Sequence, residues 1–234
     1  MQNINIAENI TLCLTIGKRP ELLRQTLNSL LSKAKFKQII AINDFRDEET
    51  NLVFKELCPE GLLINLPNQV GHHKAVDEMY SKVQTDYIFH CEDDWLFDQP
   101  IEFEKYIEII KSNPKATQLC FRKWIDFPFS EEQKSQIKFI ESSPLNLARF
   151  DSMHDQWHGF TFNPHLASIE LWKSMPKGFS EFKKERHVSR WLRAQQRYVL
   201  FLENGICHHI GEDESVANAS KKSWFAKWKG KIFG

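Results

Sequence analysis

Residues Asp86-Tyr-Ile-Phe-His-Cys-Glu-Asp-Asp-Trp95 join an apolar run to three consecutive carboxylates. The run over residues 86–91 is rich in aromatic and apolar side chains, which is typical of a buried strand. Adjacent carboxylates repel one another, and each resists losing its water. A solvated turn, or a helix that Asp94 caps, would accommodate them. At the end of a central parallel strand, a divalent cation would relieve the repulsion, and carboxylate oxygens suit Mg²⁺ or Mn²⁺.

The residues before this stretch alternate between strand and helix patterns. Pro20 begins the first helix, because the N–H that proline lacks has no partner at that position anyway. The expected strands span residues 10–16, 37–43 and 61–65, and the expected helices span residues 20–31, 48–57 and 71–83. Four strands that alternate with three helices predict an α/β fold whose mostly parallel central sheet is covered by helices.

Ligands of such sheets bind beyond the carboxyl ends of the strands, so the loops there are the candidate site. The first of these loops, Thr15-Ile-Gly-Lys-Arg-Pro20, fits neither G-x-x-x-x-G-K-S/T nor G-x-G-x-x-G. The sequence therefore disfavours a P-loop NTPase and a dinucleotide-binding dehydrogenase.

Composition narrows the class of protein further. The chain has 234 residues, with 31 Lys plus Arg against 31 Asp plus Glu, and this balance argues against a dedicated nucleic-acid binder. No signal-peptide pattern is visible, and no apolar run approaches the ~18 residues of a membrane span. The five cysteines are odd in number and form no C-x-x-C pair, which indicates small core side chains in a reducing compartment. We therefore expect a cytoplasmic protein.

Three blocks, in this order, resemble family 2-type glycosyltransferases of the GT-A fold. In the first, residues 11–31, a strand and a loop ending in Arg19-Pro20 lead into a Leu-rich helix. The second, residues 71–95, resembles the helix, strand and D-x-D segment of the family, here Glu92-Asp93-Asp94 with Glu in first position. The third, His209-Ile-Gly-Glu-Asp-Glu-Ser215, is similar to the His-x-Gly…Ser segment that closes many of these domains.

The resemblance implies one GT-A (Rossmann-like) domain over residues 1–220, with a nucleotide-sugar-binding half over residues 1–98 and an acceptor-binding half over residues 99–220. It implies transfer of a sugar from a nucleotide-diphosphate donor, with UDP as the expected nucleotide, to a glycan or glycolipid hydroxyl with inversion. Polysaccharide or lipopolysaccharide biosynthesis would need such an enzyme.

The resemblance also implies a role for each acidic residue of the motif. Asp94 and His209 would be protein ligands of Mn²⁺ or Mg²⁺, which bridges the two phosphates of the donor. Glu92 and Asp93 would contact the ribose, the metal or its waters.

Other donor contacts follow from the loops. Thr15, Arg19 and Asp44 come after the first two strands, where the family holds the nucleobase and ribose. For Asp44 a turn is an equally good interpretation. Lys74 would reach a phosphate or would lie on a helix surface.

Inverting transfer needs a carboxylate that takes the proton of the acceptor hydroxyl. The family pattern, Glu-Asp before a helix with Ser-Arg-x-Leu, aligns with residues 184–192 and places Glu185 at the Asp position. The first acid of that pair is replaced by Lys184, and Glu181 is a rival for the base. An exposed helix whose glutamates pair with Lys and Arg explains the same residues.

We expect an acceptor pocket in which aromatic residues of the second half stack on sugar faces, with core packing as the alternative interpretation. The candidates are Trp124, Trp157 and Phe160.

The segment 221–234 carries five Lys, four aromatic residues and no acid. Such a segment suits an anionic membrane surface on the inner face of the membrane, and a terminal helix packed on the domain is the alternative.

Two other functions fit the same features less well. A catalytically silent GT-A-like module could bind glycans or act as a scaffold. A sugar nucleotidyltransferase shares the α/β layout and the use of a metal, but its first loop is richer in glycine.

Overall fold

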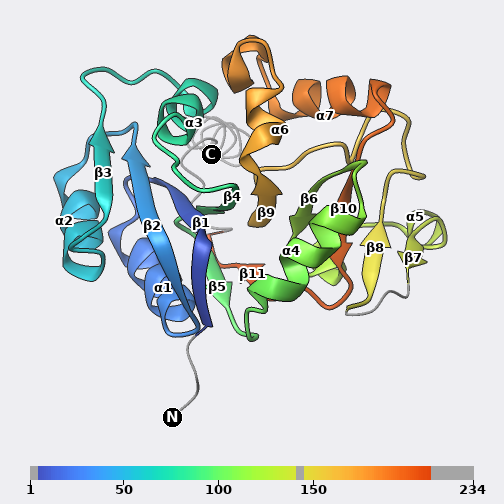
Figure 1. Ribbon diagram of the computed structural model, residues 1–234, viewed down its shortest axis with the longest axis horizontal. Coiled ribbons are helices and arrows are strands. Elements are labelled where there is room, and N and C mark those ends of the chain that lie inside the picture. Colours follow the sequence, from blue (N-terminus) through green and yellow to red (C-terminus); the bar gives the residue numbers. More distant parts are fainter. Residues whose placement is uncertain (1–4, 141–144, 212–234) are drawn as a thin grey trace, which may run out of the picture.

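The computed structural model of the chain describes residues 5–140 and 145–211, and within them one large sheet is flanked by helices on both faces (Figure 1). Nine strands form this sheet in the order β3-β2-β1-β4-β9-β6-β10-β8-β7, and β11 pairs with β5 in a small second sheet. The strands are β1 Asn5–Ile16, β2 Ala34–Asn43, β3 Leu62–Asn65, β4 Tyr87–Glu92, β5 Trp95–Phe97, β6 Ala116–Cys120, β7 Lys138–Ile140, β8 Leu147–Arg149, β9 His165–Ser168, β10 Tyr198–Leu202 and β11 Cys207–His209.

Helices connect and cover these strands. They are α1 Pro20–Leu31, α2 Glu48–Leu57, α3 His72–Tyr80, α4 Phe103–Ser112, α5 Glu131–Lys134, α6 Ile169–Lys173 and α7 Glu185–Ala194. Two 3₁₀ turns, η1 Trp124–Asp126 and η2 Gly178–Glu181, complete the described elements.

The predicted α/β fold class is confirmed, and the first half of the chain follows the predicted alternation closely. Helices α1 and α2 have the predicted bounds, whereas β1 begins at Asn5 rather than at residue 10. Strands β3, β2, β1 and β4 are all parallel. The second half is mixed, because β9 runs antiparallel to both β4 and β6, and β8 runs antiparallel to β10 and β7. The sheet is therefore mostly but not wholly parallel.

The core lies on both faces of the sheet because successive strand side chains point to opposite sides. Leu12 and Leu14 of β1 pack with α1, α2 and α4, whereas Cys13 between them packs with α3, α6 and α7. All five cysteines are buried and free, as expected for small core side chains.

The aromatic residues predicted to line an acceptor pocket do not share one. Phe160 is buried in the core against Phe162 and Phe179. Trp157 is exposed and stacks on His154, whereas Trp124 lies against Phe139. The prediction of a pocket formed by all three residues is wrong, because the apolar face of the sheet buries Phe160.

Two predictions concern residues that lie beyond the described ranges: the basic segment 221–234, and the part of the His209–Ser215 block that follows Gly211. Within residues 5–140 and 145–211, no helix combines the length and the apolar character needed to cross a membrane.

Candidate active site

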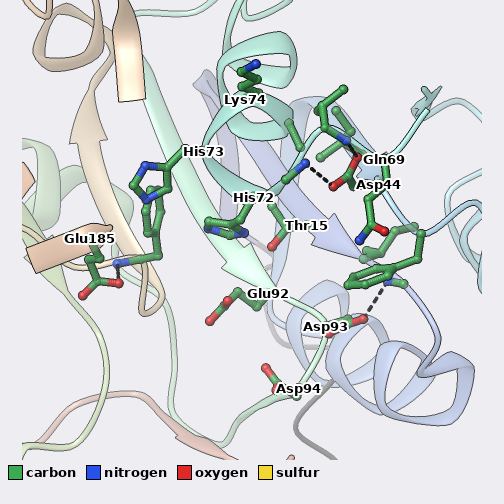
Figure 2. A pocket seen from close by; sticks show the side chains of 18 of the residues that line it. Thr15, Asp44, Gln69, His72, His73, Lys74, Glu92, Asp93, Asp94 and Glu185 are labelled. Carbon is green, nitrogen blue, oxygen red and sulfur yellow. Dashed lines mark hydrogen bonds between the residues drawn. The ribbon is translucent and has the colours of Figure 1, made fainter. Parts of the chain in front are cut away.

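A cleft of about 920 Å³ opens at the carboxyl ends of β1, β2 and β4 (Figure 2). These strands are parallel, so the loops that follow them meet at one edge of the sheet. Side chains from the second half of the chain close the other side of the cleft. Nine of the predicted site residues line it: Thr15, Arg19, Asp44, Lys74, Glu92, Asp93, Asp94, Glu185 and His209.

Arg19 holds the two aspartates of the acidic motif together. Its guanidinium bonds to Asp93 through Nη2, and its Nη1 donates to Oδ2 of Asp94 at 2.5 Å. Both aspartates are almost fully buried, so a nearby positive charge offsets the cost of bringing carboxylates together without water. The position of Arg19 explains how the chain tolerates adjacent buried acids at this edge.

A close approach of two loops also fixes Asp93. The backbone N–H of Gly17 donates to Oδ2 of Asp93 at 2.9 Å. A Cβ at position 17 would lie 2.3 Å from Cδ2 of Phe45, so only glycine fits between the two loops.

Asp94 also contacts His209, through the same oxygen that bonds to Arg19. Nε2 of His209 lies 2.9 Å from Oδ2 of Asp94, and the N–H of Ile210 donates to the backbone oxygen of Asp94 at 2.9 Å. The pairing of β11 with β5 brings these residues together, since His209 lies opposite Trp95. A Cβ at Gly211 would lie 2.6 Å from Oδ2 of Asp94, which shows how closely the chain covers this carboxylate.

Burial and mutual repulsion separate the pKa values of the three acids. Burial, with the charges of Asp94, Glu185 and Asp93, raises the pKa of Glu92 to about 8. Burial also raises the pKa of Asp93 to about 7, although Arg19 opposes the shift. Burial acts in the same direction on Asp94, but hydrogen bonds from His209 and the charge of Arg19 outweigh it and lower the pKa of this carboxyl. Asp94 is therefore the acid of the motif that is held most firmly as a carboxylate.

The donor atoms around Asp94 fit a hard divalent cation. Oδ1 of Asp94 is buried and has no hydrogen-bond partner, so its lone pairs are free for a ligand. An oxygen of this kind beside an imidazole suits Mn²⁺ or Mg²⁺. In the described ranges no group of three or more His, Cys, Asp or Glu side chains is arranged as a complete metal site. Asp94 and His209 are the side chains here that could hold such an ion, and further ligands would come from water or from a bound ligand.

Asp44 fastens one loop of the cleft. Its Oδ1 accepts the N–H of Val70 at 2.7 Å, and its Oδ2 accepts the N–H of Gly71 at 2.8 Å. The turn after β2 is made instead by Asn43, whose Oδ1 accepts the N–H groups of Phe45 and Arg46. The structure thus places Asp44 as a link between the end of β2 and the start of α3, inside the cleft.

Several lining residues were not predicted. Phe45 and Gln69 lie in loops after strand ends, where a search for ligand contacts could have found them. His72 begins α3 and lines the cleft, and its ring packs edge-on against Phe162. Phe162 and Asn163 reach the cleft from the loop before β9, and no sequence signal marks them.

Glu185 faces the motif across the cleft (Figure 2). It is the first residue of α7, and its Oε2 accepts the N–H of Phe162 at 3.3 Å. Burial raises the pKa of this carboxyl. The rival candidate Glu181 is exposed on η2 and does not line the cleft. Tertiary structure thus brings Glu185, and not Glu181, to the motif.

Side chains of α3 hold the segment that precedes α7. Asp77 accepts the N–H groups of Phe179 at 2.7 Å and Ser180 at 2.8 Å, as well as the indole N–H of Trp172 at 2.8 Å. Nδ1 of His73 lies 2.6 Å from the backbone oxygen of Phe182 and so donates to it. These bonds tie η2 to α3, so the helix that carries Lys74 and the segment that leads to Glu185 form one rigid unit.

Comparison with known proteins addresses the family and the fold. Residues 12–171 match the sequence model of the family described as glycosyl transferase family 2. No curated protein matches the chain in sequence.

Similar solved structures include a mannosyltransferase and S. aureus TarS. The mannosyltransferase PcManGT from Pyrobaculum calidifontis, in complex with GDP-Man and Mn²⁺, superposes with a TM-score of 0.63 at 10% identity over 91% of this chain and 61% of that one. S. aureus TarS, residues 1–349, superposes with a TM-score of 0.58 at 10% identity over 87% of this chain and 60% of that one. The chain thus spans about three fifths of the length of these structures. At such low identity the likeness shows a shared GT-A fold.

Proposed function

The chain belongs to glycosyl transferase family 2, and we propose that it moves a sugar from a nucleotide-diphosphate donor to a glycan or glycolipid hydroxyl with inversion. One observation carries this proposal: Glu185 lies in the same cleft as the buried motif Glu92-Asp93-Asp94. A cleft with a base candidate on one side and a cation-binding carboxylate on the other has the two groups that such a transfer needs.

The donor would lie along the loops after β1 and β2. Thr15, Phe45 and Gln69 line this end of the cleft, and the ring of Phe45 offers a flat apolar surface for a nucleobase. The amine of Lys74 lies on the same side, at the start of α3, where it would approach the phosphates. The mannosyltransferase with the same fold binds GDP-Man, which supports a nucleotide-sugar donor here. UDP remains the expected nucleotide.

Asp94 and His209 would hold Mn²⁺ or Mg²⁺, whose charge offsets the negative charge that grows on the leaving nucleotide diphosphate, an effect worth several kcal/mol. The free Oδ1 of Asp94 supports this assignment. Arg19 keeps both aspartates in place, so the carboxylate is oriented before the donor arrives.

Glu185 would take the proton from the attacking hydroxyl. Its raised pKa suits this role, because a base whose pKa approaches the working pH accepts a proton more readily. The N–H of Phe162 donates to one oxygen of Glu185 and so helps to orient the carboxylate. General base catalysis of this kind contributes roughly 10²–10⁴ to the rate.

A thermal-shift panel tests the proposal. UDP-, GDP-, CMP- and dTDP-sugars are each added with Mn²⁺ and with EDTA. We expect one nucleotide to raise the melting temperature in Mn²⁺ alone, because a ligand that binds only the folded state stabilises it. Absence of any shift, also with acceptor glycans present, would contradict the proposal and favour a silent glycan-binding module.

A pair of matched variants then tests the base. Glu185→Gln should abolish transfer while the nucleotide still raises the melting temperature. Glu181→Gln is the control, since it changes an acid four residues away that lies outside the cleft lining. Loss of transfer in the Glu181 variant alone would move the base to that residue.

A further inference from the structure

Four cations surround Glu185 and point away from the core. Lys183, Lys184, Arg186 and Arg190, which we call the basic collar, are all exposed. Lys183 also lines the cleft. Arg186 and Arg190 are four residues apart on α7, which places them on one face of the helix.

Five lysines in or beside other helices pair with a nearby glutamate: Lys55, Lys82, Lys105, Lys134 and Lys173. The members of the basic collar do not. The acid within α7 is Glu185, and it faces the cleft and the N–H of Phe162. Among residues 5–140 and 145–211, none forms an ion pair with a member of the collar.

The field of the collar acts on its neighbour His187. Desolvation and the charges of Arg186, Arg190, Lys184 and Lys183 together lower the pKa of this imidazole. Unpaired like charges at this spacing destabilise a helix slightly, so the fold itself gains nothing from them. A function that needs positive charge beside the base explains their position.

The diphosphate of the donor is a poor match for the collar. The donor would lie toward β1 and α3, where Asp94, His209 and Lys74 line the cleft. The collar, apart from Lys183, lies outside that lining and flanks Glu185 at the start of α7. It is therefore placed to contact the acceptor.

We propose that the acceptor carries phosphate groups and that the basic collar binds them while the hydroxyl lies at Glu185. This inference rests on the proposed function. Arginine binds phosphate oxygens through two N–H groups at once, and the two arginines on one helix face lie about 5–6 Å apart at Cβ, so that they can contact neighbouring phosphates.

The test compares two triple variants of the full chain. In the first, Lys184→Gln, Arg186→Gln and Arg190→Gln neutralise the collar without touching the cleft lining. In the control, Lys35→Gln, Lys37→Gln and Lys111→Gln remove the same charge from exposed lysines at the amino end of β2 and on α4. The probes are a glycerol phosphate oligomer, an uncharged malto-oligosaccharide of equal length, and phosphatidylglycerol vesicles. Nucleotide diphosphate and Mn²⁺ are kept in excess to fill the donor site.

We expect the wild type to bind the phosphate oligomer and not the uncharged one. The collar variant should bind it about 10-fold or more weakly, whereas the control should stay within about 2-fold. Added salt should weaken the wild-type interaction, because the charges are exposed. Equal losses in both variants, or equal binding of the uncharged oligomer, would overturn the proposal. Binding to the vesicles without binding to the soluble oligomer would overturn it in favour of a membrane contact.

Nucleotide binding separates this inference from the function on which it rests. If the wild type and the collar variant give the same Mn²⁺-dependent thermal shift, the donor site is intact in both. A difference in binding of the phosphate oligomer is then due to the collar alone. If no nucleotide binds the wild type, the proposed function fails. Oligomer binding would then still show a phosphate-binding surface but would overturn its role in an acceptor site.

Discussion

On the side of the cleft formed by β1 and β4, Asp93 and Asp94 are buried and both contact the guanidinium of Arg19. On the other side, the four cations of the basic collar, at the start of α7 and just before it, are exposed and have no acidic partner among the described residues. Little of either aspartate is exposed to water, so protein groups must offset much of their charge. The cations of the basic collar remain hydrated and need no acidic partner to stay charged. The comparison teaches that the acids of the first side already have a positive partner within the protein, while the cations of the second side have no acidic partner among the described residues.

Removal of a buried acid should have the largest effect. Asp94→Asn should lower transfer by about 10³-fold and abolish the Mn²⁺-dependent thermal shift, because the substitution removes the carboxylate charge beside the metal. Steady-state kinetics and the thermal-shift assay measure both effects. Asp98→Asn is the control, since Asp98 is a partly exposed acid paired with Lys123. Intact metal-dependent donor binding in the Asp94 variant would show that the buried side does not hold the cation.

The second largest loss of transfer is expected at Glu185, which lies across the cleft from the acidic motif. Glu185→Gln should lower transfer by roughly 10²–10⁴ while donor binding stays within experimental error, because the amide cannot accept the proton of the hydroxyl. The kcat of the transfer reaction is the measurement. Equal losses of kcat and of donor affinity would instead indicate that Glu185 supports the donor site.

The same residue predicts a pH dependence. Burial raises the pKa of Glu185, so the carboxylate form is lost at a higher pH than for an exposed glutamate. Transfer should therefore fall as the pH is lowered through this raised pKa and should level off above it. The pH profile of kcat checks the sign, and a profile that rises toward acidic pH would contradict the assignment.

Asp77, which links α3 to η2 by hydrogen bonds, should contribute to the free energy of unfolding. Asp77→Ala leaves the N–H groups of Phe179 and Ser180 and the indole of Trp172 without their acceptor and should cost roughly 1–3 kcal/mol. Urea unfolding measures the loss. The neighbouring Glu78→Ala, which breaks a half-exposed pair with Lys82, should cost less than about 0.5 kcal/mol. Similar costs for both variants would show that the clamp on η2 contributes little.

The smallest effect is expected on the side of the exposed cations, where a substitution should increase the stability of the fold. Arg190→Gln removes a like charge four residues from Arg186 and should raise the free energy of unfolding by about 0.2–0.5 kcal/mol. Urea unfolding at low and high salt measures it, and the gain should shrink in high salt. A clear loss of stability would mean that Arg190 has a partner in the folded chain, which would weaken the contrast between the two sides.

The sequence was most informative where the chain alternates regularly. The bounds of α1 and α2, the parallel order of the first four strands and the place of Asp93 and Asp94 at a strand end all follow from local apolar periodicity and from the rule for β-α-β units. The position of β9 between β4 and β6 does not, because its partners are set by packing between distant segments.

In the candidate site, too, some features follow from the sequence and others only from the tertiary structure. Sequence alone determined that Thr15, Asp44 and Glu92 lie at or next to the carboxyl ends of strands of one parallel sheet, since each strand and the loop after it are neighbours along the chain. Only the tertiary structure decided that Arg19 bridges Asp93 and Asp94, that Glu185 rather than Glu181 enters the cleft, and that Phe160 lies in the core. The physical reason is that such contacts join residues far apart in sequence, and the free energy of burial that selects them belongs to the whole packed domain.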